Sequence, residues 1–234
     1  MLSPAELRRR AVALRDAPPE RVVTWALAAF PGRAALTVSF GGGGVVLAHI
    51  VSRVDRSVPV LFLDTGFHFP ETLAFKDAFV ARYGLNLVEL RPLTEVGPLY
   101  VTDPDRCCHA RKVAPLERAL AGFDAWISAV RADQSRTRAG TEVIEYHEID
   151  GRGIAKVFPL ARWSREDVWR YIREHGVPHH PLLDRGYASI GCWPCTRATA
   201  QGEPERAGRW SGTGKTECGL HTFTKKARAV RGER

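Results

Sequence analysis

The stretch "AALTVSFGGGGVVLAHIVSRV" at residues 34–54 decides which fold we expect. Its first part, 34–40, is an apolar run with β-strand character, so it predicts a buried strand. Four glycines follow at 41–44, and an apolar, helix-like stretch runs from 45 to 54. The next apolar run, "VPVLFLD" at 58–64, predicts a second strand. Strand, helix and strand in this order are typical of a parallel sheet.

The same alternation continues along the chain. We expect helices from the capping box "SPAE" at 3–6, over 18–30, over 70–84, and from Ser164 to about His175; we expect strands at 86–90, 124–130, 142–148 and 154–160. The sequence therefore predicts an α/β fold, a parallel sheet with helices on both faces. Regular patterning fades after about residue 176, which predicts a loop-rich C-terminal arm. We assign residues 1–200 to a nucleotide-binding α/β domain and 201–234 to a mobile basic tail.

The composition is that of an ordinary globular protein with an excess of positive charge. The 234 residues are 44% hydrophobic and 26% charged, with a formal net charge of +8. Residues 197–234 hold nine Lys or Arg against four Glu, so an anion is attracted most strongly to this end. The start lacks the apolar run of a signal peptide, and no long apolar window indicates a membrane span. We expect a cytoplasmic protein.

Three short motifs directly follow predicted strands: "SFGGGG" at 39–44, "LDTG" at 63–66 and "AVRADQS" at 129–135. In parallel sheets ligands bind beyond the carboxyl ends of the strands, so we expect a nucleotide-sized ligand there. The glycine loop matches neither common phosphate-binding motif and also fits a simple tight turn. The candidate substrate contacts in the first two of these motifs are Ser39, Phe40, Gly41, Asp64, Thr65 and Gly66.

Four of the five cysteines come in pairs, Cys107 with Cys108 and Cys192 with Cys195. In a reducing compartment such pairs indicate metal ligands more than disulfides. Adjacent residues of a helix point about 100° apart, which suits one zinc ion poorly and a larger cluster better. We therefore favour a 4Fe–4S cluster, with zinc and a metal-free set of buried thiols as the alternatives.

The fifth cysteine, Cys218, lies near the end of the chain between Lys215 and His221. Nearby cations favour its thiolate form, and a thiolate on a mobile arm can attack an anionic substrate. Lys112 follows Cys108 by four residues, so on a helix both lie on one face. It can balance the charge of a cluster or contact a bound anion; a solvated surface lysine is the simpler alternative.

Four motifs carry a resemblance to a known family: "LDTGFHFPET", "CCHARK", "GCWPCT" and "RWSGTGKTECGLHT", in that order. Over roughly residues 20–222 the chain resembles the assimilatory adenylyl-sulfate reductases, the cluster-containing branch of the phosphoadenylyl-sulfate reductase family. The resemblance implies an adenine nucleotide α-hydrolase-like fold. It also implies reduction of adenosine 5'-phosphosulfate to sulfite and AMP, with thioredoxin or glutaredoxin as reductant, and it is compatible with a homo-oligomer.

The resemblance also implies residue roles. A 4Fe–4S cluster is bound by Cys107, Cys108, Cys192 and Cys195, and serves structure and electrostatics. Lys112 lies between the cluster and the substrate sulfate, and Cys218 attacks sulfur to give an S-sulfocysteine. His221 orients the tail or the substrate. The arginines that contact the substrate anion are Arg131, Arg206 and Arg209.

The sequence departs from the family pattern at two points. Its glycine loop is "GGGG" where relatives carry acidic or amide residues, so adenosine contacts there are expected from the backbone. Ala132 stands where relatives often have a second arginine, so one anion contact is either missing or supplied by Arg136 or Arg138.

The sequence admits three other interpretations. The first is the same chemistry on 3'-phosphoadenylyl sulfate. The second, an ATP pyrophosphatase, needs an acid and a serine that the glycine loop lacks. The third is a zinc-stabilised nucleic-acid-binding module, which leaves Cys218 and the glycine loop unexplained. We expect no nucleic-acid partner.

Overall fold

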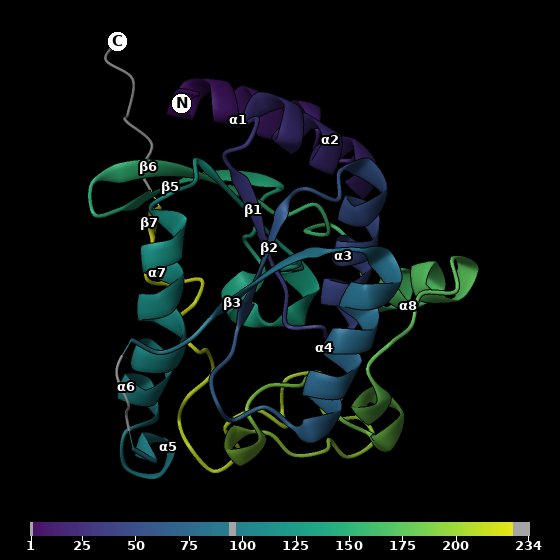
Figure 1. Ribbon diagram of the computed structural model, residues 1–234, viewed down its shortest axis with the longest axis vertical. Coiled ribbons are helices and arrows are strands. Elements are labelled where there is room, and N and C mark those ends of the chain that lie inside the picture. The colour runs from purple at the N-terminus through teal and green to yellow at the C-terminus, as the bar shows by residue number, and fades with distance from the viewer. Residues whose placement is uncertain (1, 94–96, 227–234) are drawn as a thin grey trace.

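The computed structural model describes residues 2–93 and 97–226, and Figure 1 shows the arrangement of its elements. The helices are α1 (Pro4–Ala13), α2 (Pro19–Ala29), α3 (Gly42–Val54), α4 (Pro70–Tyr83), α5 (Leu99–Thr102), α6 (Pro104–Cys108), α7 (Ala114–Leu120) and α8 (Arg165–Glu174). The strands are β1 (Ala34–Thr37), β2 (Pro59–Leu63), β3 (Asn86–Leu90), β4 (Ala125–Ser128), β5 (Ile144–Ile149), β6 (Arg152–Val157) and β7 (Lys225–Lys226). A π-helix, His109–Val113, joins α6 to α7.

The strands form one sheet in the order β3-β2-β1-β4-β6-β5-β7. The first five are parallel, which confirms the predicted α/β class, while β5 and β7 are antiparallel to their neighbours. The reversal at β5 has a local cause. Asp150 and Gly151 both adopt positive φ angles, 48° and 75°, and this two-residue turn makes β5 and β6 a hairpin.

Helices cover both faces of the sheet, as the sequence predicts, but unequally (Figure 1). The face carrying Leu36, Val60 and Ile127 packs against α1 to α4 and α8 in the main core. The other face carries Ala35, Leu61 and Trp126. It packs against Leu116 and Leu120 of α7 and against Leu220 and Phe223 of the C-terminal segment. A stretch predicted as a loop-rich arm therefore forms part of the second layer.

The strand order reverses between β1 and β4: β2 and β3 extend the sheet beyond β1, and β6 and β5 extend it beyond β4. Open α/β sheets bind ligands at such a reversal. The loop after β1 starts α3 with Gly42–Gly44. A Cβ at Gly43 would lie 3.4 Å from the Ala129 carbonyl oxygen and 3.7 Å from the Arg131 guanidinium. Glycine thus lets the two loops lie close together, with Arg131 beside the start of α3.

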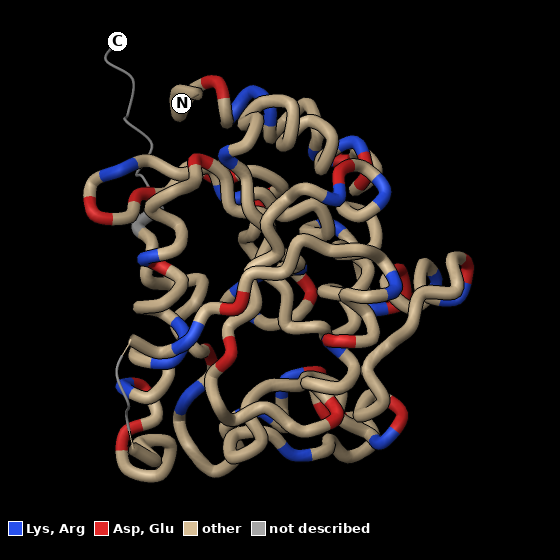
Figure 2. The backbone as a smooth tube through the Cα atoms, viewed as in Figure 1, with Lys and Arg blue, Asp and Glu red and all other residues tan. Residues whose placement is uncertain are grey.

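Charged residues of both signs are interspersed along the backbone (Figure 2). Part of the positive charge of the C-terminal segment is paired within it, as where Arg197 contacts Glu203 at 2.9 Å. None of the helices in residues 2–93 and 97–226 is long and apolar enough to cross a membrane.

His180 connects the loop after α8 to α4 through hydrogen bonds. It is fully buried; its Nδ1 accepts a hydrogen bond from the Leu182 N–H (3.2 Å), so its Nε2–H donates to Thr72 Oγ1 (2.8 Å). Burial lowers the pKa of His180 to about 4, against a small opposing effect of Glu71. The folded protein therefore holds this imidazole neutral.

We predict that the stability of the protein falls as pH drops from about 6.5 to about 4. In this window the unfolded chain binds a proton at His180 that the folded chain does not, so stability rises with pH. His180→Gln should lower the free energy of unfolding at pH 7 by about 1–3 kcal/mol and flatten the slope. Urea unfolding at pH 7 and pH 5 measures both. His179→Gln, at a half-exposed neighbour, is the control, and an unchanged slope in His180→Gln would contradict the assignment.

Candidate active site

The two cysteine pairs lie around one cavity. Cys107 and Cys108 end α6, and Cys192 and Cys195 flank a short turn at Trp193–Cys195. The cavity is lined by Phe67, Tyr100, Pro104, Cys107, Cys108, Arg111, Lys112, Cys192, Cys195 and Trp210. The structure thus brings together two segments that are far apart in the sequence.

The "LDTG" loop joins these two segments. Thr65 Oγ1 contacts Cys192 Sγ at 3.3 Å, and the Thr65 carbonyl accepts a hydrogen bond from Arg111 at 2.8 Å. The Trp193 N–H donates to the Phe67 carbonyl at 2.8 Å. Thr65, a predicted substrate contact, therefore has its hydroxyl against a cysteine sulfur. Asp64 accepts from the Gly66 N–H (3.1 Å) and pairs with Arg91 (3.3 Å).

Lys112 is a buried cation among thiols. It is 9% exposed and lies in the π-helix that follows α6, one turn beyond Cys108. Burial disfavours its charge, but the thiols of Cys192 and Cys218, when ionised, outweigh this effect and raise its pKa. The alternative of a solvated surface lysine is wrong, because the side chain is enclosed.

Burial also sets the ionisation of the paired thiols. It raises the pKa of Cys107 and Cys195, and that of Cys108 to about 11. Cys192 differs: burial pushes its pKa up, but the charge of Lys112 and the hydrogen bond from Thr65 more than compensate, so the pKa is lowered. Of the four thiols, Cys192 is therefore the one whose thiolate form is favoured by its surroundings.

The donor set around this cavity is chemically suited to an iron–sulfur cluster. Four thiols line one cavity, and cationic side chains at Arg111 and Lys112 lie beside them to offset negative charge. Among the described residues, no three His, Cys, Asp or Glu side chains are placed so as to hold a metal ion. The thiols therefore lie around a cavity, without the geometry of a site for one ion.

The arm that carries Cys218 is packed around Trp210. This indole is 4% exposed, and the cations of Arg209, Arg206 and Lys215 lie 4.6, 5.6 and 5.8 Å from its ring. Arg209 also donates to the Ile190 carbonyl at 3.2 Å, next to the second cysteine pair. Two of the predicted anion-binding arginines, Arg206 and Arg209, are thus held at the cavity by one aromatic ring.

Glu217, the residue before Cys218, is fixed by two arginines. Arg138 donates to both of its carboxylate oxygens (3.0 and 2.9 Å), and Arg206 lies 3.1 Å away. Burial opposes the charge of Glu217, but these contacts lower its pKa, so it is ionised. Arg138, considered as a substrate contact, is therefore engaged in holding the arm.

Cys218 lies beside the π-helix. Gly219 has a φ of 87°, and a Cβ on it would lie 3.3 Å from Val113 Cγ2, next to Lys112. Cys218 is close enough to Cys108 and Lys112 for its charge to act on both. The predicted nucleophile, the buried lysine and the paired cysteines thus occupy one region.

His221 lies flat on Trp126, with ring centroids 5.1 Å apart and planes 10° apart. Burial, then the charge of Lys156, holds its pKa well below the usual range, so the imidazole is neutral. Its Nδ1 is one of several buried atoms of the described chain without a hydrogen-bond partner. Others are Ser128 Oγ, Thr196 Oγ1, Arg206 Nε and Arg209 Nε. The fold does not use these donors and acceptors.

The glycine-loop candidates divide into exposed and buried groups. Ser39 is exposed, whereas the Phe40 ring is fully buried against Phe62 and Phe79, at a backbone φ of 55°. Only the backbone of Phe40 can therefore meet a ligand. Gly41 caps α3, and Arg131, 2% exposed, pairs with Asp133 (2.9 Å) and Glu205 (2.7 Å).

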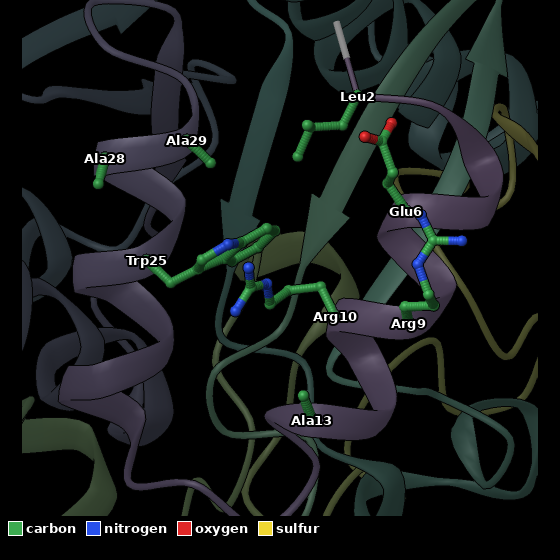
Figure 3. A pocket seen from close by; sticks show the side chains of 8 residues that line it. All are labelled: Leu2, Glu6, Arg9, Arg10, Ala13, Trp25, Ala28 and Ala29. Atoms are coloured by element: carbon green, nitrogen blue, oxygen red, sulfur yellow. The ribbon is translucent and has the colours of Figure 1, made fainter.

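A hollow of about 650 Å³ lies elsewhere, between α1 and α2 (Figure 3). It is lined by residues such as Leu2, Glu6 and Trp25, and Arg10 lies over the Trp25 ring at 5.8 Å. None of the predicted site residues lines it.

Comparison with known proteins agrees with this geometry. Residues 33–198 match the model of the phosphoadenosine phosphosulfate reductase domain, and the chain belongs to this family. It is 48% identical over 216 residues (89% of this chain, 90% of the relative) to adenosine 5'-phosphosulfate reductase of Streptomyces coelicolor. It is 42% identical over 217 residues (88% and 89%) to phosphoadenosine 5'-phosphosulfate reductase of Gloeobacter violaceus. The resemblance found in the sequence is confirmed.

Solved structures support the fold. The phosphoadenylyl-sulfate reductase of Candida auris superposes with a TM-score of 0.74 at 31% identity, covering 84% of this chain and 98% of that one. The FMN adenylyltransferase of Candida glabrata reaches a TM-score of 0.58 at 15% identity, covering 91% and 76%, which shows a common fold alone. The predicted adenine nucleotide α-hydrolase-like architecture is confirmed.

We predict that Gly219→Ala displaces Cys218. The new methyl group meets Val113 in a backbone conformation that alanine disfavours, so turnover should fall about 10–100-fold. Gly212→Ala is the matched control: its φ is 80°, but a Cβ there meets nothing within 4 Å. Steady-state sulfite formation measures both variants. Equal losses in the two would mean that backbone strain, and not the contact at Val113, matters.

Proposed function

We propose that this chain reduces adenosine 5'-phosphosulfate to sulfite and AMP, with Cys218 as the nucleophile. The observation that carries the proposal is the folding of the Cys218 arm back onto the cavity that holds Lys112 and the four paired cysteines. Relatives 40–48% identical to this chain are named adenosine 5'-phosphosulfate reductase, which supports the choice of substrate.

Substrate binding follows from the placement of cations. The crevice between β1 and β4 receives the adenosine and α-phosphate, where the glycine loop offers backbone N–H groups beside Arg131. Arg206, Arg209 and Lys112 face the sulfate end, because all three lie near Cys218 or the cysteine cavity. Arginine forks pair two oxygens of a sulfate or phosphate at once.

The first step is attack by Cys218. Its thiolate sulfur forms a bond to the sulfate sulfur as the bond from that sulfur to the phosphate oxygen breaks. The electron pair of the broken bond leaves on AMP, and an S-sulfocysteine remains. Lys112 and the arginines offset the negative charge that gathers on the leaving phosphate. A neutral His221 suits an orienting role, since AMP departs as an anion and needs no proton.

The second step needs a dithiol reductant such as thioredoxin or glutaredoxin. A reductant thiolate attacks Cys218 Sγ, the bond to the sulfonate breaks, and sulfite leaves with the electron pair. The second reductant thiol then displaces Cys218 from the mixed disulfide. Two thiols become one disulfide, and this supplies the two electrons. We expect the arm of residues 201–234 to move outward for this exchange, and the reaction to take place in the reducing cytoplasm.

The four paired cysteines would hold a 4Fe–4S cluster. When bound, the cluster supplies a fixed negative charge and ties α6 to the turn at Trp193–Cys195. Lys112 lines the same cavity as the four thiols, so the charge of the cluster would help to keep this side chain charged for contact with the substrate sulfate. Arg111 stabilises the loop next to the cysteine cavity by donating a hydrogen bond to the Thr65 carbonyl.

Phosphoadenylyl sulfate is the second candidate substrate. It is favoured by the names of the Gloeobacter violaceus relative and of the Candida auris structure. The two substrates differ by one 3'-phosphate, so the ratio of kcat/KM on each decides between them.

We predict that Cys218→Ser forms sulfite at less than about one-thousandth of the wild-type rate, because a hydroxyl cannot accept the sulfonate in this way. Binding of AMP and iron content should be unchanged. Sulfite assays and AMP titration measure the two properties. Sulfite release at the wild-type rate would exclude Cys218 as the nucleophile.

We predict about four irons and four acid-labile sulfides per chain in protein purified without air. Cys108→Ala should lose most of both, because one of the four ligands is missing, whereas Cys218→Ser should keep them. Metal analysis and the visible absorption spectrum measure this. Zinc without sulfide in the wild-type protein, or full iron in Cys108→Ala, would contradict the cluster.

A further inference from the structure

Lys156 is a lysine buried at the centre of the sheet. It lies on β6, is 1% exposed, and its ammonium group stands 4.7 Å from the Trp126 ring and 5.6 Å from the Phe158 ring. Lysine is almost never fully buried unless it is paired, because removing the charge from water is costly. Its position therefore needs an explanation.

The C-terminal arm supplies acceptors for this cation. Lys156 Nζ donates to the His221 carbonyl and to Thr224 Oγ1, each at 3.2 Å. Thr224 is 6% exposed, and its hydroxyl also contacts His147 Nδ1 at 2.7 Å. Two hydrogen bonds of a buried ammonium group thus depend on a segment at the far end of the chain.

The contacts continue beyond Thr224. His147 Nε2 lies 2.7 Å from Glu145 Oε2 on the same strand, β5. If His147 is the neutral tautomer with its proton on Nε2, every bond has one direction: Lys156 to Thr224, Thr224 to His147, and His147 to Glu145. The threonine hydroxyl then connects a buried cation on β6 to a carboxylate on β5. Beside it, β7 pairs with β5 at Glu148 and His147.

We propose that Lys156 and Thr224 form an anchor that docks the C-terminal arm and so positions Cys218. Neither residue touches the reacting atoms; both act through the arm. Cys218 precedes His221 by three residues, which even a fully extended chain spans in about 10 Å. Fixing the His221 carbonyl therefore restricts Cys218 to the region of Lys112. The proposal rests on the proposed function for its catalytic consequence, but docking itself does not.

The anchor also explains how one arm can serve two steps. The arm gives Lys156 two acceptors, the His221 carbonyl and the Thr224 hydroxyl, and release of the arm removes both of these contacts and the contact of Thr224 with His147. The docked state is therefore favoured at rest, and a reductant that pulls the arm outward works against a localised contact. His221 leaves Trp126 of β4 when the arm is released, since His221 supplies both the stacked ring and one of the acceptors.

The test compares Thr224→Val, which keeps the shape but removes the hydroxyl, with Thr224→Ser, which keeps the hydroxyl. Cys218 is alkylated with iodoacetamide in the intact holoprotein, and modification is followed by mass spectrometry of the tryptic peptide 216–225. We expect Thr224→Val to be alkylated about tenfold faster than wild type, and Thr224→Ser within about twofold of it, because the lost hydrogen bonds involve a buried charge. Amide exchange of residues 219–224 should rise in parallel.

Lys156→Met is the second variant, and Lys76→Met is its matched control. Lys76 is also a buried lysine, 6% exposed, but it lies on α4 and pairs with Glu89 of β3. Only Lys156→Met should speed alkylation of Cys218. In single-turnover assays, Thr224→Val should slow S-sulfocysteine formation about tenfold.

Wild-type alkylation and exchange rates in both Thr224→Val and Lys156→Met would overturn the anchor. The same rates in Thr224→Ser and Thr224→Val would do so as well. Because alkylation and exchange need no substrate, a protein that shows the expected changes but forms no sulfite would keep the anchor and disprove the proposed function.

Discussion

The second face of the sheet is the constraint on which the site depends. Within residues 2–93 and 97–226, α7 is the helix that packs on it, and its side chains Leu116 and Leu120 leave Trp126 to be covered by another segment. The C-terminal arm does this with His221 and Phe223, whose rings lie 5.1 and 5.9 Å from the indole. The burial of the apolar surface around Trp126 by the arm thus brings Cys218 close to the cysteine cavity. The segment that bears the proposed nucleophile is also a layer of the fold, so burial and reactivity are coupled through the same residues.

The ionisation of the site depends on which buried groups have a nearby opposite charge or hydrogen bond that offsets the effect of burial on their pKa. Three of the paired thiols have their pKa raised by desolvation, and Cys192 escapes this because Lys112 and Thr65 lie against it. Lys112 in turn keeps its charge because of thiols on three different segments. Charge in this region is therefore a shared property of the loop after β2, the π-helix, the second cysteine pair and the arm. Removing one segment changes the ionisation of the others.

Much of this could be predicted from the sequence, and the rest has clear physical reasons. The strands β1 to β6 and the helices α1 to α4 and α8 follow from local periodicity, whereas the helices α5, α6 and α7 were not predicted. The motifs identify the paired cysteines, Lys112 and Cys218. The strand β1 is shorter than predicted, since the left-handed Phe40 turns the chain early and buries its own ring. The docking of the arm, the pairing of Arg138 with Glu217 and the role of Lys156 rest on contacts across about 70 residues. No local pattern encodes such contacts.

The arginines of the arm lie close to other positive charges, and an anionic substrate would reduce the repulsion among them. Arg206 is buried, and burial together with the nearby charge of Arg138 lowers its pKa to about 10. Arg209 and Lys112 add further positive charge, while Glu217 is the carboxylate that Arg138 and Arg206 share. One carboxylate offsets only part of this repulsion. A bound phosphosulfate would offset more of it, and most effectively when the arm is docked. Substrate binding and arm docking should therefore favour one another, because both place negative charge among the same buried cations.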